Sequence, residues 1–435
     1  PIAIQNFMLA LVSATDAIML GWIDQTSLSA VSLAGQVQFV LSLFISGIAA
    51  GAGIMAAQYW GKQDAASIEK VIPIALRTNL LFSGLFTILA GFCPEILMRI
   101  FTNDAALVAS GSQYLRAVAL SYVLCGISQV YLILLKNTGH AAVSSRISST
   151  AVVLNIILNA ILIYGLCGAP ALGIRGAAYA TVAARVVELI WAYLETKKPE
   201  RVRILWNRLF SSAGKILSED FWRYTLPVLA ASLVWGIAYV LYSVIMGHMG
   251  SDAVAANSIT SIAKSLLSCL IRGVSGGAGV LIGNLLGADE LEKAREYGGR
   301  LTHLAIAIGV VTGGLLMLIS PAIVHFAPLT DTAAEYLQYM LLFCGLNLMA
   351  QSVNTTVLDG IFCAGGDAKF DMQGNIGAMW CFSVPLGFLA AFWLKLPVMV
   401  VYCIVNLDEI VKLPAVYLHY KKYVWVRNIT RDIEE

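Results

Sequence analysis

Charged residues are scarce in this chain. Asp, Glu, Lys and Arg make up only 12% of its 435 residues, about half the fraction found in a typical soluble globular domain. That scarcity excludes an ordinary soluble protein. Hydrophobic residues instead make up 59% of the sequence, and apolar runs of roughly 20 residues, the length that a helix needs to cross a bilayer, recur along all of it. The sequence therefore predicts a polytopic membrane protein.

Motifs for ATP hydrolysis, metal binding and disulfide bonding are also missing. The run GGAG from Gly276 lacks the Gly-Lys-Ser/Thr of a phosphate-binding loop, which favours an ion gradient over ATP as the energy source. The eight cysteines form no CxxC pair, and the five histidines show no metal-ligand spacing. We expect no enzyme, no metal and no cofactor besides transported H+ or Na+. A membrane enzyme acting on lipid-linked substrates would need a cluster of acids or a metal at a membrane face, and none is evident in the sequence.

Twelve apolar segments are predicted to cross the membrane as helices. The runs are continuously apolar, whereas the strands of a membrane barrel alternate in segments of about ten residues. The expected fold is therefore all-α, with twelve transmembrane helices. The segments lie near residues 2–23, 31–59, 71–93, 114–135, 147–167, 174–194, 222–248, 254–286, 301–327, 335–362, 372–394 and 397–420.

Lysine and arginine lie mostly on one side of these segments. If both termini are inside, the outer segments hold only Arg99, Arg116, Arg175 and Lys395. Positive residues concentrate in cytoplasmic loops, so we expect a multi-pass protein of the cytoplasmic membrane with both termini in the cytoplasm. Its expected partners are the lipid bilayer and a small, drug-like substrate, without nucleic acid, and it is expected to be a monomer.

The chain contains an internal duplication. Shifted by 226 residues, the segment from Leu20 meets the segment from Met246 without a gap, and LLKNTGHAAVSSR from Leu134 meets IFCAGGDAKFDMQ at an offset of 227. Two six-helix lobes then share one orientation and are related by a pseudo-twofold axis along the membrane normal, an architecture typical of transporters. We predict an N-terminal lobe, a cytoplasmic linker, a C-terminal lobe and a basic cytoplasmic tail at residues 1–196, 197–220, 221–420 and 421–435.

Four segments resemble a known family: DAIMLGWIDQTSLSAVSLA from Asp16, AQYWGKQD, LGIRGAAYATVAAR and NLDEIVKLPAVYLHYKKYVWVRNIT. Together they resemble the multidrug and toxic compound extrusion (MATE) family over essentially the whole chain. The resemblance implies an antiporter that exports cationic or amphipathic compounds in exchange for H+ or Na+. Pro1, fifteen residues before Asp16, and Asn155 match the DinF-like branch of the family.

The chain departs from the family pattern at three positions. Asn159 stands where many relatives have a second acid. Trp235 and Ser352 stand where NorM-like members have acidic ion ligands. The resemblance therefore places the ion-coupling role on Asp16.

Asp16 is an acid inside an apolar segment, where a carboxylate costs about 2.5–3.5 kcal/mol and is usually kept for function. Gln5 and Asn6 share its side of a helix with 3.6 residues per turn, and Asn155 and Asn159 form a second polar face at i and i+4. We predict that the two faces meet, and that Asp16, Asn155 and Asn159 form the ion-coupling site.

At such a site, a cationic cargo and a proton would compete for one negative charge. Na+ could compete in the same way, with the two amides as oxygen donors, but a single carboxylate favours H+. The alternative is that Asp16 only hydrogen-bonds neighbouring helices.

Candidate cargo-binding side chains lie on several expected helices. The aromatic stripe near Tyr239 could hold a flat cation, or it could be packing. The polar face near Gln351 could line a cavity, or it could join helices. Lys264 and Arg272 are cations inside a span and suit anionic or zwitterionic cargo, which leaves open a MATE-related exporter or flippase of a dedicated metabolite, natural product or lipid-linked sugar. The full set is Gln5, Asn6, Gln36, Trp235, Tyr239, Tyr242, Lys264, Arg272, Asn347, Gln351 and Asn354.

Two charge pairs are predicted to be structural. Lys412 follows Glu409 by three residues and Asp408 by four, and Arg185 precedes Glu188 by three. Side chains at these spacings are neighbours on a helix surface.

Overall fold

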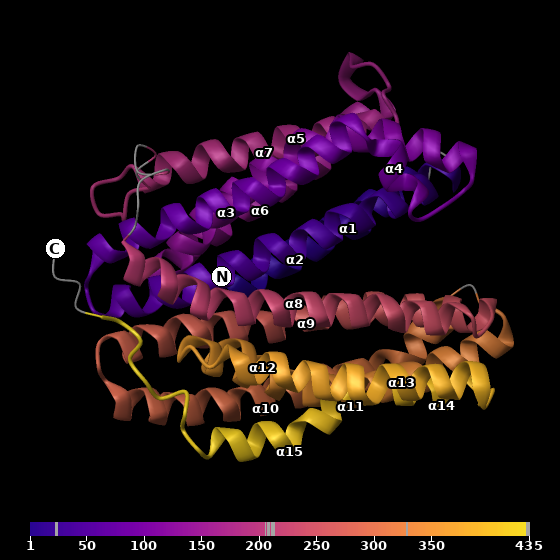
Figure 1. Cartoon of the computed structure of the whole chain (residues 1–435). Helices are drawn as coiled ribbons and strands as arrows, with labels where there is room; N and C mark the ends of the chain where they lie inside the picture. The colour runs from indigo at the N-terminus through magenta and orange to yellow at the C-terminus, as the bar shows by residue number, and fades with distance from the viewer. Residues whose placement is uncertain (22–24, 205, 207–208, 210–213, 328, 432–435) are drawn as a thin grey trace. The chain divides into compact units, whose positions relative to one another are not determined.

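The computed structural model describes the chain except for residues 22–24, 205, 207–208, 210–213, 328 and 432–435. All regular structure in the described part is helical, which confirms the predicted fold class (Figure 1). Helices form because a bilayer offers no water to the backbone, so each N–H and C=O must pair within its own segment. Part of the predicted linker at 197–220 lies outside the described residues.

The helices form two compact units, and the division along the chain falls between Leu229 and Ala230. The first unit holds α1 (Ile2–Gly21), α2 (Gln25–Gly61), α3 (Ala65–Phe92), α4 (Pro94–Arg99), α5 (Ala105–Leu135), η1 (Lys136–His140), α6 (Ala141–Tyr164), η2 (Leu166–Gly168), α7 (Ile174–Thr196) and the start of α8 (Lys215–Gly247).

The second unit holds the remainder of α8 and the helices that follow it. These are α9 (Ser251–Gly287), α10 (Leu291–Phe326), α11 (Asp331–Thr355), η4 (Thr356–Phe362), α12 (Ala368–Asn375), η5 (Ile376–Ser383), α13 (Val384–Phe388), η6 (Leu389–Trp393), α14 (Val398–Val405) and α15 (Asp408–Tyr420). The elements η4, η5 and η6 are π-helical insertions that extend α11, α12 and α13.

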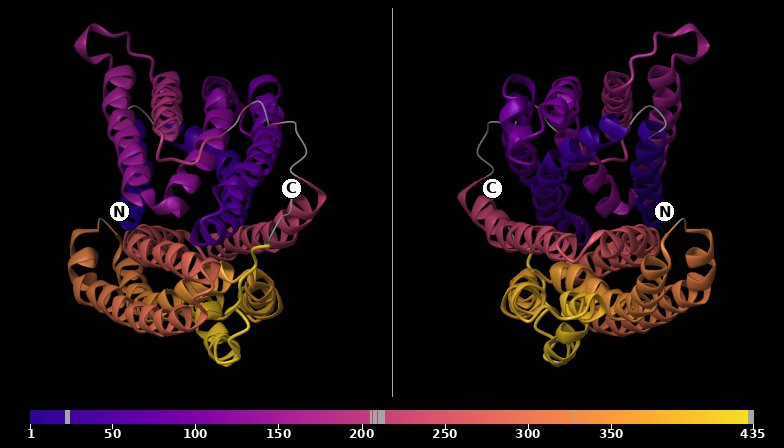
Figure 2. Two further views of the ribbon diagram at one scale, coloured as in Figure 1. Left: turned by 90° about the vertical axis from the view of Figure 1, so that its left-hand side faces the viewer. Right: turned by 90° about the vertical axis from the view of Figure 1, so that its right-hand side faces the viewer.

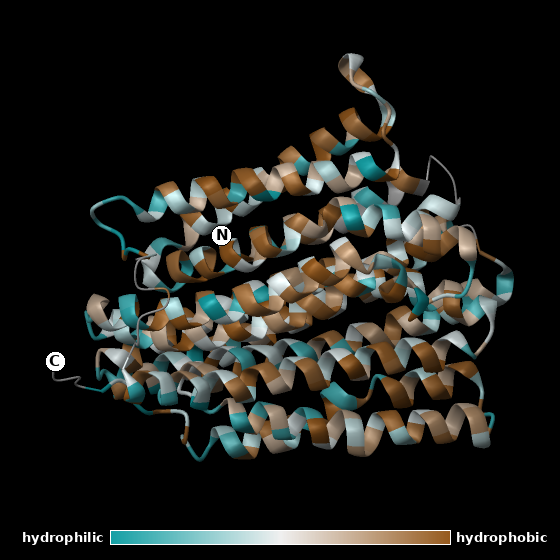
Figure 3. Ribbon diagram, turned by 45° about the horizontal axis from the view of Figure 1, so that its top comes forward, coloured by the Kyte–Doolittle hydropathy of each residue, from teal (hydrophilic) through white to brown (hydrophobic). Residues whose placement is uncertain are grey.

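Nine stretches among the described helices are long and apolar enough to cross a membrane, and one of them combines α5 and α6 across a kink. Within each unit the long helices run side by side (Figure 2). Hydrophilic residues gather at the helix ends and in the connections, whereas the middles of the helices are largely hydrophobic (Figure 3). This distribution is the one expected of helices whose middles face hydrocarbon.

Each unit has its own apolar core. In the first unit, Leu115, Val118 and Tyr122 of α5 pack among buried residues of α2, α3 and α7. In the second unit, Leu337 and Leu341 of α11 pack among buried residues of α9, α10 and α14. The cores fix the helices that carry the polar groups described below.

The duplicated sequence folds in the same way at one tight turn in each unit. Gly139, between α5 and α6, has φ of 81°, and Gly366, before α12, has φ of 73°. These glycines are equivalent at the offset of 227 residues. A residue with a Cβ atom rarely adopts this left-handed conformation, so the turn itself requires glycine in both copies.

Helices α10 and α11 approach closely through small residues. A Cβ atom added at Gly345 would lie 2.9 Å from the carbonyl oxygen of Gly313 and 2.7 Å from Cγ of Met317. In contrast, a Cβ atom at Gly314 would have no heavy atom within 4 Å. Small residues let membrane helices pack at short range, so Gly345 is a contact point and Gly314 is not.

We expect Gly345→Val to destabilise the second unit by about 1–3 kcal/mol, because the added methyl groups overpack the contact between α10 and α11. Gly314→Val is the matched control, and it should leave stability unchanged. The measurement is the temperature at which half of the purified protein in detergent stops eluting as a single species. Equal midpoints for the two variants would contradict the packing argument.

The last predicted span is broken into two helices. The sequence predicts one helix at 397–420. In the structure α14 ends at Val405 and α15 begins at Asp408, and Asn406 between them has non-helical angles of φ −100° and ψ 14°. Asp408 lies about 18 Å along the helix from Tyr420 at 1.5 Å per residue. In a hydrocarbon core of about 30 Å, the break is therefore near the middle of the span.

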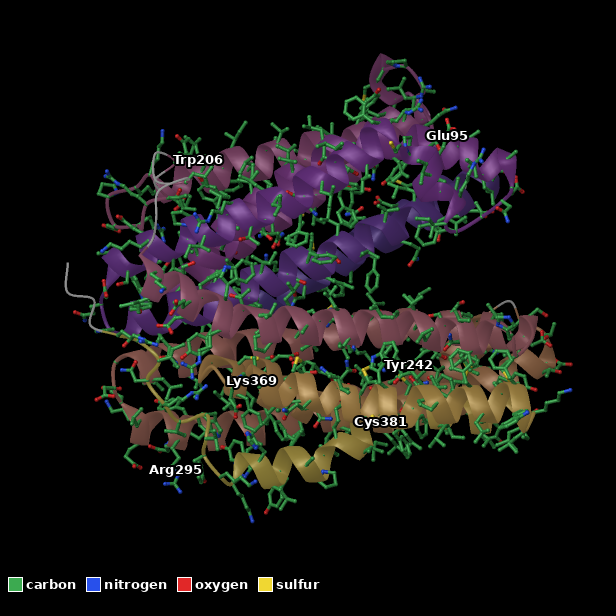
Figure 4. The ribbon with its side chains drawn as sticks, viewed as in Figure 1. Glu95, Trp206, Tyr242, Arg295, Lys369 and Cys381 are labelled. Atoms are coloured by element: carbon green, nitrogen blue, oxygen red, sulfur yellow. The ribbon has the colours of Figure 1, made fainter. Side chains whose placement is uncertain are left out.

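The residues after α15 fold onto the end of the second unit. Trp425 is fully buried in a core with Ile282 and Phe362. The guanidinium of Arg427 donates hydrogen bonds of 2.7 Å to the carbonyl oxygens of Gly365 and Gly366. Arg295, which is labelled in Figure 4, lies 3.8 Å from the centre of the Tyr423 ring. The basic segment after Tyr420 therefore packs against the second unit through Tyr423, Trp425 and Arg427.

Candidate functional site

The polar face of α1 lies against α6 in the first unit. Nδ2 of Asn159 donates a hydrogen bond of 2.5 Å to Oδ1 of Asp16. Three helical turns away, Nε2 of Gln5 donates to Oγ of Ser148 at 2.8 Å. The structure thus brings together the two faces that the helical period of the sequence predicts.

The asparagines of α6 continue this network to α7. Nδ2 of Asn159 also lies 3.3 Å from Oδ1 of Asn155, and Nδ2 of Asn155 donates to Oγ1 of Thr181 at 3.3 Å. Asn155 and Asn159 are buried, at 5% and 0% exposure, and Asp16 is half-buried. Asp16, Asn155, Asn159 and Thr181 therefore form one connected group, which we call the α1–α6–α7 site.

The sequence-based prediction missed Thr181. Threonine in a membrane helix commonly bonds its own backbone, and Thr181 does donate to the carbonyl oxygen of Ala177 at 3.0 Å. The available signal was its position as the single Ser or Thr within the alanine-rich stretch GAAYATVAAR. Its oxygen becomes part of the site only because α7 packs against α6.

The α1–α6–α7 site presents oxygen atoms around one negative charge. Oδ1 of Asn159 is buried and has no hydrogen-bond donor among the described residues. Within the same described part of the chain, no Lys, Arg or His forms an ion pair with Asp16. Tyr114 of α5 interacts electrostatically with Asp16. A carboxylate with amide and hydroxyl neighbours can bind a proton or a hard cation.

The aromatic stripe of α8 divides into an open part and a packed part. Trp235 and Tyr239 stack, with ring centres 5.5 Å apart, and Tyr239 is 42% exposed. Tyr242 is 9% exposed and packs in a core with Met379 and Val384, and its label lies beside α8 on the side of α12 and α13 in Figure 4. Tyr239 therefore offers the open ring surface of the stripe, and Trp235, half-buried against the same core, stacks on it.

The polar face of α11 is used mainly to hold the broken last span. Nδ2 of Asn347 donates to the carbonyl oxygen of Asn406 at 2.6 Å, and Oδ1 of Asn347 accepts from Nζ of Lys264 at 3.0 Å. Asn354 donates to both the backbone and the side chain of Glu409. These contacts support the interpretation that this face joins helices, because both amide side chains are about 1% exposed.

The remaining candidate cargo residues are more open. Gln36 and Arg272 are exposed, whereas Asn6, Lys264 and Gln351 are half-buried. Asp359, which the sequence places near the inner end of its span, is exposed and interacts electrostatically with Arg272. Of the two intramembrane cations, Lys264 thus has an amide partner and Arg272 faces an acid.

Both predicted charge pairs are present. Nζ of Lys412 lies 3.1 Å from Oε1 of Glu409 and 3.9 Å from Oδ2 of Asp408. Nη1 of Arg185 lies 2.8 Å from Oε2 of Glu188. The sequence-based prediction missed that the Lys412 pair is buried and continues to α12, where Asn375 accepts from Lys412 at 3.2 Å. The sequence alone did not indicate that Asn375 of α12 would reach a residue of the last span.

A family model agrees with this architecture. The model described as MatE matches residues 1–161 and 227–389, one block in each half of the duplicated chain. The curated relatives include the "Uncharacterized transporter YisQ" of Bacillus subtilis, 21% identical over 98% of this chain and 93% of its own length. The "Probable multidrug resistance protein NorM" of Agrobacterium fabrum is 24% identical over 88% of this chain and 83% of its own.

Solved structures show the same fold. A structure described as "Outward-facing conformation of a multidrug resistance MATE family transporter of the MOP superfamily" superposes with a TM-score of 0.87 at 20% identity, over 98% of this chain and 94% of that chain. Another, of a MOP superfamily transporter from Pyrococcus furiosus, also gives a TM-score of 0.87 at 20% identity, over 97% of this chain and 94% of that chain. Its description states that reverse polarity of its binding pocket suggests a different function.

Proposed function

Because this chain belongs to the MatE family of membrane transporters, we propose that it is a secondary active antiporter. In this proposal it exports cationic or amphipathic small molecules in exchange for H+, by alternating access, and Na+ is the other candidate coupling ion. Family membership makes the chain a multi-pass transporter and not an enzyme. We further propose that it acts as a monomer in the cytoplasmic membrane with both termini in the cytoplasm. Its assignment to the DinF-like branch stays a prediction.

The observation that carries the proposal is the α1–α6–α7 site. It places one carboxylate, Asp16, in an apolar helix with an amide donor at 2.5 Å and with no ion pair to a basic side chain in the described part of the chain. An unneutralised carboxylate is costly at this depth, so the site favours any ligand that removes its charge. A proton, a cationic cargo and Na+ are each such a ligand.

Competition for Asp16 would couple the two transport directions. A nearby cation favours the ionised carboxylate, and a bound proton neutralises it, so cargo and proton cannot both satisfy the same charge. If the transporter changes conformation only when the charge of Asp16 is neutralised, it moves either cargo or a proton across the membrane. It does not change conformation with Asp16 charged and unoccupied. Oδ1 of Asn159, which has no hydrogen-bond donor among the residues that the structure describes, supplies one further oxygen, which keeps the sodium alternative in the proposal.

The open side chains suggest the class of cargo. The stacked rings of Trp235 and Tyr239 can attract a flat organic cation, at about 0.5–2 kcal/mol per cation–π contact. The amide partner of Lys264 and the acid beside Arg272 reduce the positive charge that these residues would present. Cationic or amphipathic cargo is therefore the first proposal.

One alternative keeps the same transport mechanism with a different cargo. Arg272 is exposed, and the Pyrococcus furiosus transporter of the same fold is described by the reversed polarity of its pocket. These two observations support an exporter or flippase of a dedicated anionic metabolite, natural product or lipid-linked sugar. Its cargo would contact Arg272, so Arg272→Gln should then abolish transport, whereas it should leave cation export unchanged.

The proposal is tested by transport in proteoliposomes. We expect a pH gradient, imposed without sodium, to drive accumulation of the fluorescent cation ethidium against its own gradient, and a sodium gradient imposed at equal pH to drive much less. The control is the same vesicle without protein. Accumulation driven by sodium alone would replace H+ by Na+ in the proposal, and accumulation driven by neither gradient would contradict the antiport mechanism.

A further inference from the structure

We propose that the second unit holds a proton-binding centre of its own, formed by Asp371, Asp408 and Glu409 around Lys412. That this centre binds a proton does not depend on the proposed function. That the centre is a second coupling site of the antiporter rests on the proposed function. We call these four residues and the amides Asn354 and Asn375 the Lys412 centre.

The Lys412 centre is a connected network inside the second unit. Nζ of Lys412 lies 3.1 Å from Glu409, 3.9 Å from Asp408 and 3.2 Å from Oδ1 of Asn375. Nδ2 of Asn375 then donates to Oδ1 of Asp371 at 3.1 Å. The network thus joins α15, the second half of the last span, to α12, and none of its members belongs to the α1–α6–α7 site.

The charges of the Lys412 centre do not balance. Asp371, Asp408 and Lys412 are each 6% exposed, and Glu409 is 9% exposed, so three acids are buried with one ammonium. A buried charge without a partner is so unfavourable that the group takes a proton instead. Lys264 interacts electrostatically with Asp408 and Glu409, which balances a second acid. One acid of the three still has no cation and is expected to carry a proton.

Other ionisable groups near the centre do not restore the balance. Asp359 of η4 adds a further acid beside Asp371, and Arg272 of α9 faces Asp359. The thiol of Cys363, directly after η4, and the phenol of Tyr242 on α8 are the other ionisable neighbours, and both are ordinarily neutral. Asp359 also interacts electrostatically with Lys412 and Glu409. Asp359 and Arg272 therefore add one acid and one cation to the same group, and an excess of one acid remains.

An unpartnered amide oxygen also indicates a missing donor. Asn354 is 1% exposed, and its Nδ2 donates to Oε2 of Glu409 at 2.8 Å. Its Oδ1 is buried and has no hydrogen-bond partner in the described part of the chain. A buried acceptor without a donor is unfavourable. A protonated carboxyl group supplies such a donor, whereas an ionised one offers only acceptors.

The break in the last span places the acids where a transporter commonly binds ions. Asp408 and Glu409 are in the first turn of α15, directly after the break at Asn406. The N-terminus of a helix carries partial positive charge and favours nearby acids. Helices broken near the middle of the membrane form the ion and substrate sites of many transporters. The centre therefore combines buried acids with a backbone that is irregular at the same depth.

A proton suits this centre better than a metal cation. The ammonium of Lys412 already occupies the position between Glu409 and Asn375, so a sodium ion there would face another positive charge at short range. The described residues contain no group of three or more His, Cys, Asp or Glu arranged to hold a metal ion. A proton instead adds to a carboxylate oxygen and removes one negative charge without displacing Lys412.

The centre is also related by the duplication to the α1–α6–α7 site. The offset of 226 residues makes Tyr242 equivalent to Asp16. Tyr242 interacts electrostatically with Asp408. The first unit thus has its acid on the first helix, and the second unit has a hydroxyl at that position and acids in its last span.

Infrared spectroscopy can count the proton directly. The sample is the Asp16→Asn protein in lipid, which removes the site of the proposed function, and the spectra are recorded at neutral and at alkaline pH. A protonated carboxyl group has its own C=O band. We expect a band of about one carboxyl per protein that disappears at alkaline pH, because the acids of the group outnumber its cations by one. Replacing any one acid, by Asp371→Asn, Asp408→Asn or Glu409→Gln, should remove the band at neutral pH, since the charges then balance.

Controls and opposing outcomes separate this inference from the proposed function. Asp289→Asn, at an exposed position outside the centre, is the control and should leave the band unchanged, and exchanging choline chloride for sodium chloride should also leave it unchanged. An Asp16→Asn protein without a protonated carboxyl at neutral pH, or a band that survives all three replacements, overturns the proposal. A band lost on adding sodium overturns the assignment to a proton. If one of the three replacements prevents folding, the spectra are recorded with either of the other two variants.

The coupling role has a separate readout in proteoliposomes. With Asp16 intact, Glu409→Gln should lower the cation accumulation reached at a gradient of about one pH unit by about tenfold, because one proton fewer is exchanged per cargo and each proton contributes a factor of ten per pH unit. Accumulation equal to the unmodified protein overturns the coupling role. Loss of proton-driven transport in the unmodified protein contradicts the proposed function instead, and leaves the infrared result standing.

Discussion

The Asp16→Asn variant is expected to lose transport that depends on an ion gradient, with a fall in gradient-driven uptake of about tenfold or more, which is at least 1.4 kcal/mol of coupling. Asn is nearly the same size as Asp and can still accept the hydrogen bond that Asn159 donates to Asp16. It cannot lose or gain a proton. The substitution therefore removes the competition between cargo and proton while it keeps the contact between α1 and α6.

Stability should not fall in the same variant, because removing a carboxylate from an apolar helix relieves a cost of about 2.5–3.5 kcal/mol when the group is charged. Uptake is measured in proteoliposomes with an imposed pH gradient, and folding by the thermal midpoint in detergent. The matched control is Asp289→Asn, at an exposed position with φ of 60°, a conformation that Asn tolerates. Gradient-driven uptake that survives Asp16→Asn would show that Asp16 only joins helices.

Lys412→Met is expected to destabilise the protein by about 3–5 kcal/mol, the range found when one partner of a buried ion pair is removed. Lys412 is the nearest cation to Asp408 and Glu409, and it also donates to Asn375. Met fills a similar volume but leaves the acids without their counter-ion. The measurement is the midpoint of unfolding by sodium dodecyl sulfate in mixed micelles.

Two comparisons make the Lys412 prediction specific. Adding Glu409→Gln to Lys412→Met should recover part of the loss, because it removes one of the uncompensated charges, and the penalty should shrink as the pH falls and protons neutralise the acids. The control is Lys293→Met, which breaks an exposed pair of 2.7 Å with Glu290 and should cost roughly 0–1 kcal/mol. Equal losses for the two lysines would contradict the buried network.

The sequence was sufficient to predict the helices and the contact around Asp16. Both follow from local periodicity: apolar runs set the spans, and the helical repeat puts Gln5 and Asp16 on one side of α1 and Asn155 and Asn159 on one side of α6. Because an acid and amides in a membrane seek polar partners, two such faces are drawn together. The hydrogen bonds of Gln5 and Asp16 to α6 show this outcome.

The contacts of the second unit were harder to predict, because they depend on backbone groups whose availability cannot be read from the sequence. Asn347 and Asn354 were expected to line a cavity or join helices, and their partners include the carbonyl oxygens of Asn406 and Glu409. Those carbonyl groups are free for side chains only because the last span breaks. The break contains no Pro or Gly. Its local signals were Asn406, a residue type found at helix ends, and the acids after it, which favour a helix start.

The paired glycine turns at Gly139 and Gly366 also bear on the history of the molecule. A left-handed turn that only glycine readily adopts is present at equivalent positions of both copies, so the simplest origin is an ancestral half-length protein that already had it before its gene doubled. Asp16 and Tyr242, in contrast, differ at equivalent positions. The helical fold of each half is then older than the difference between their acidic residues. Each half acquired its acids on a different helix after the duplication.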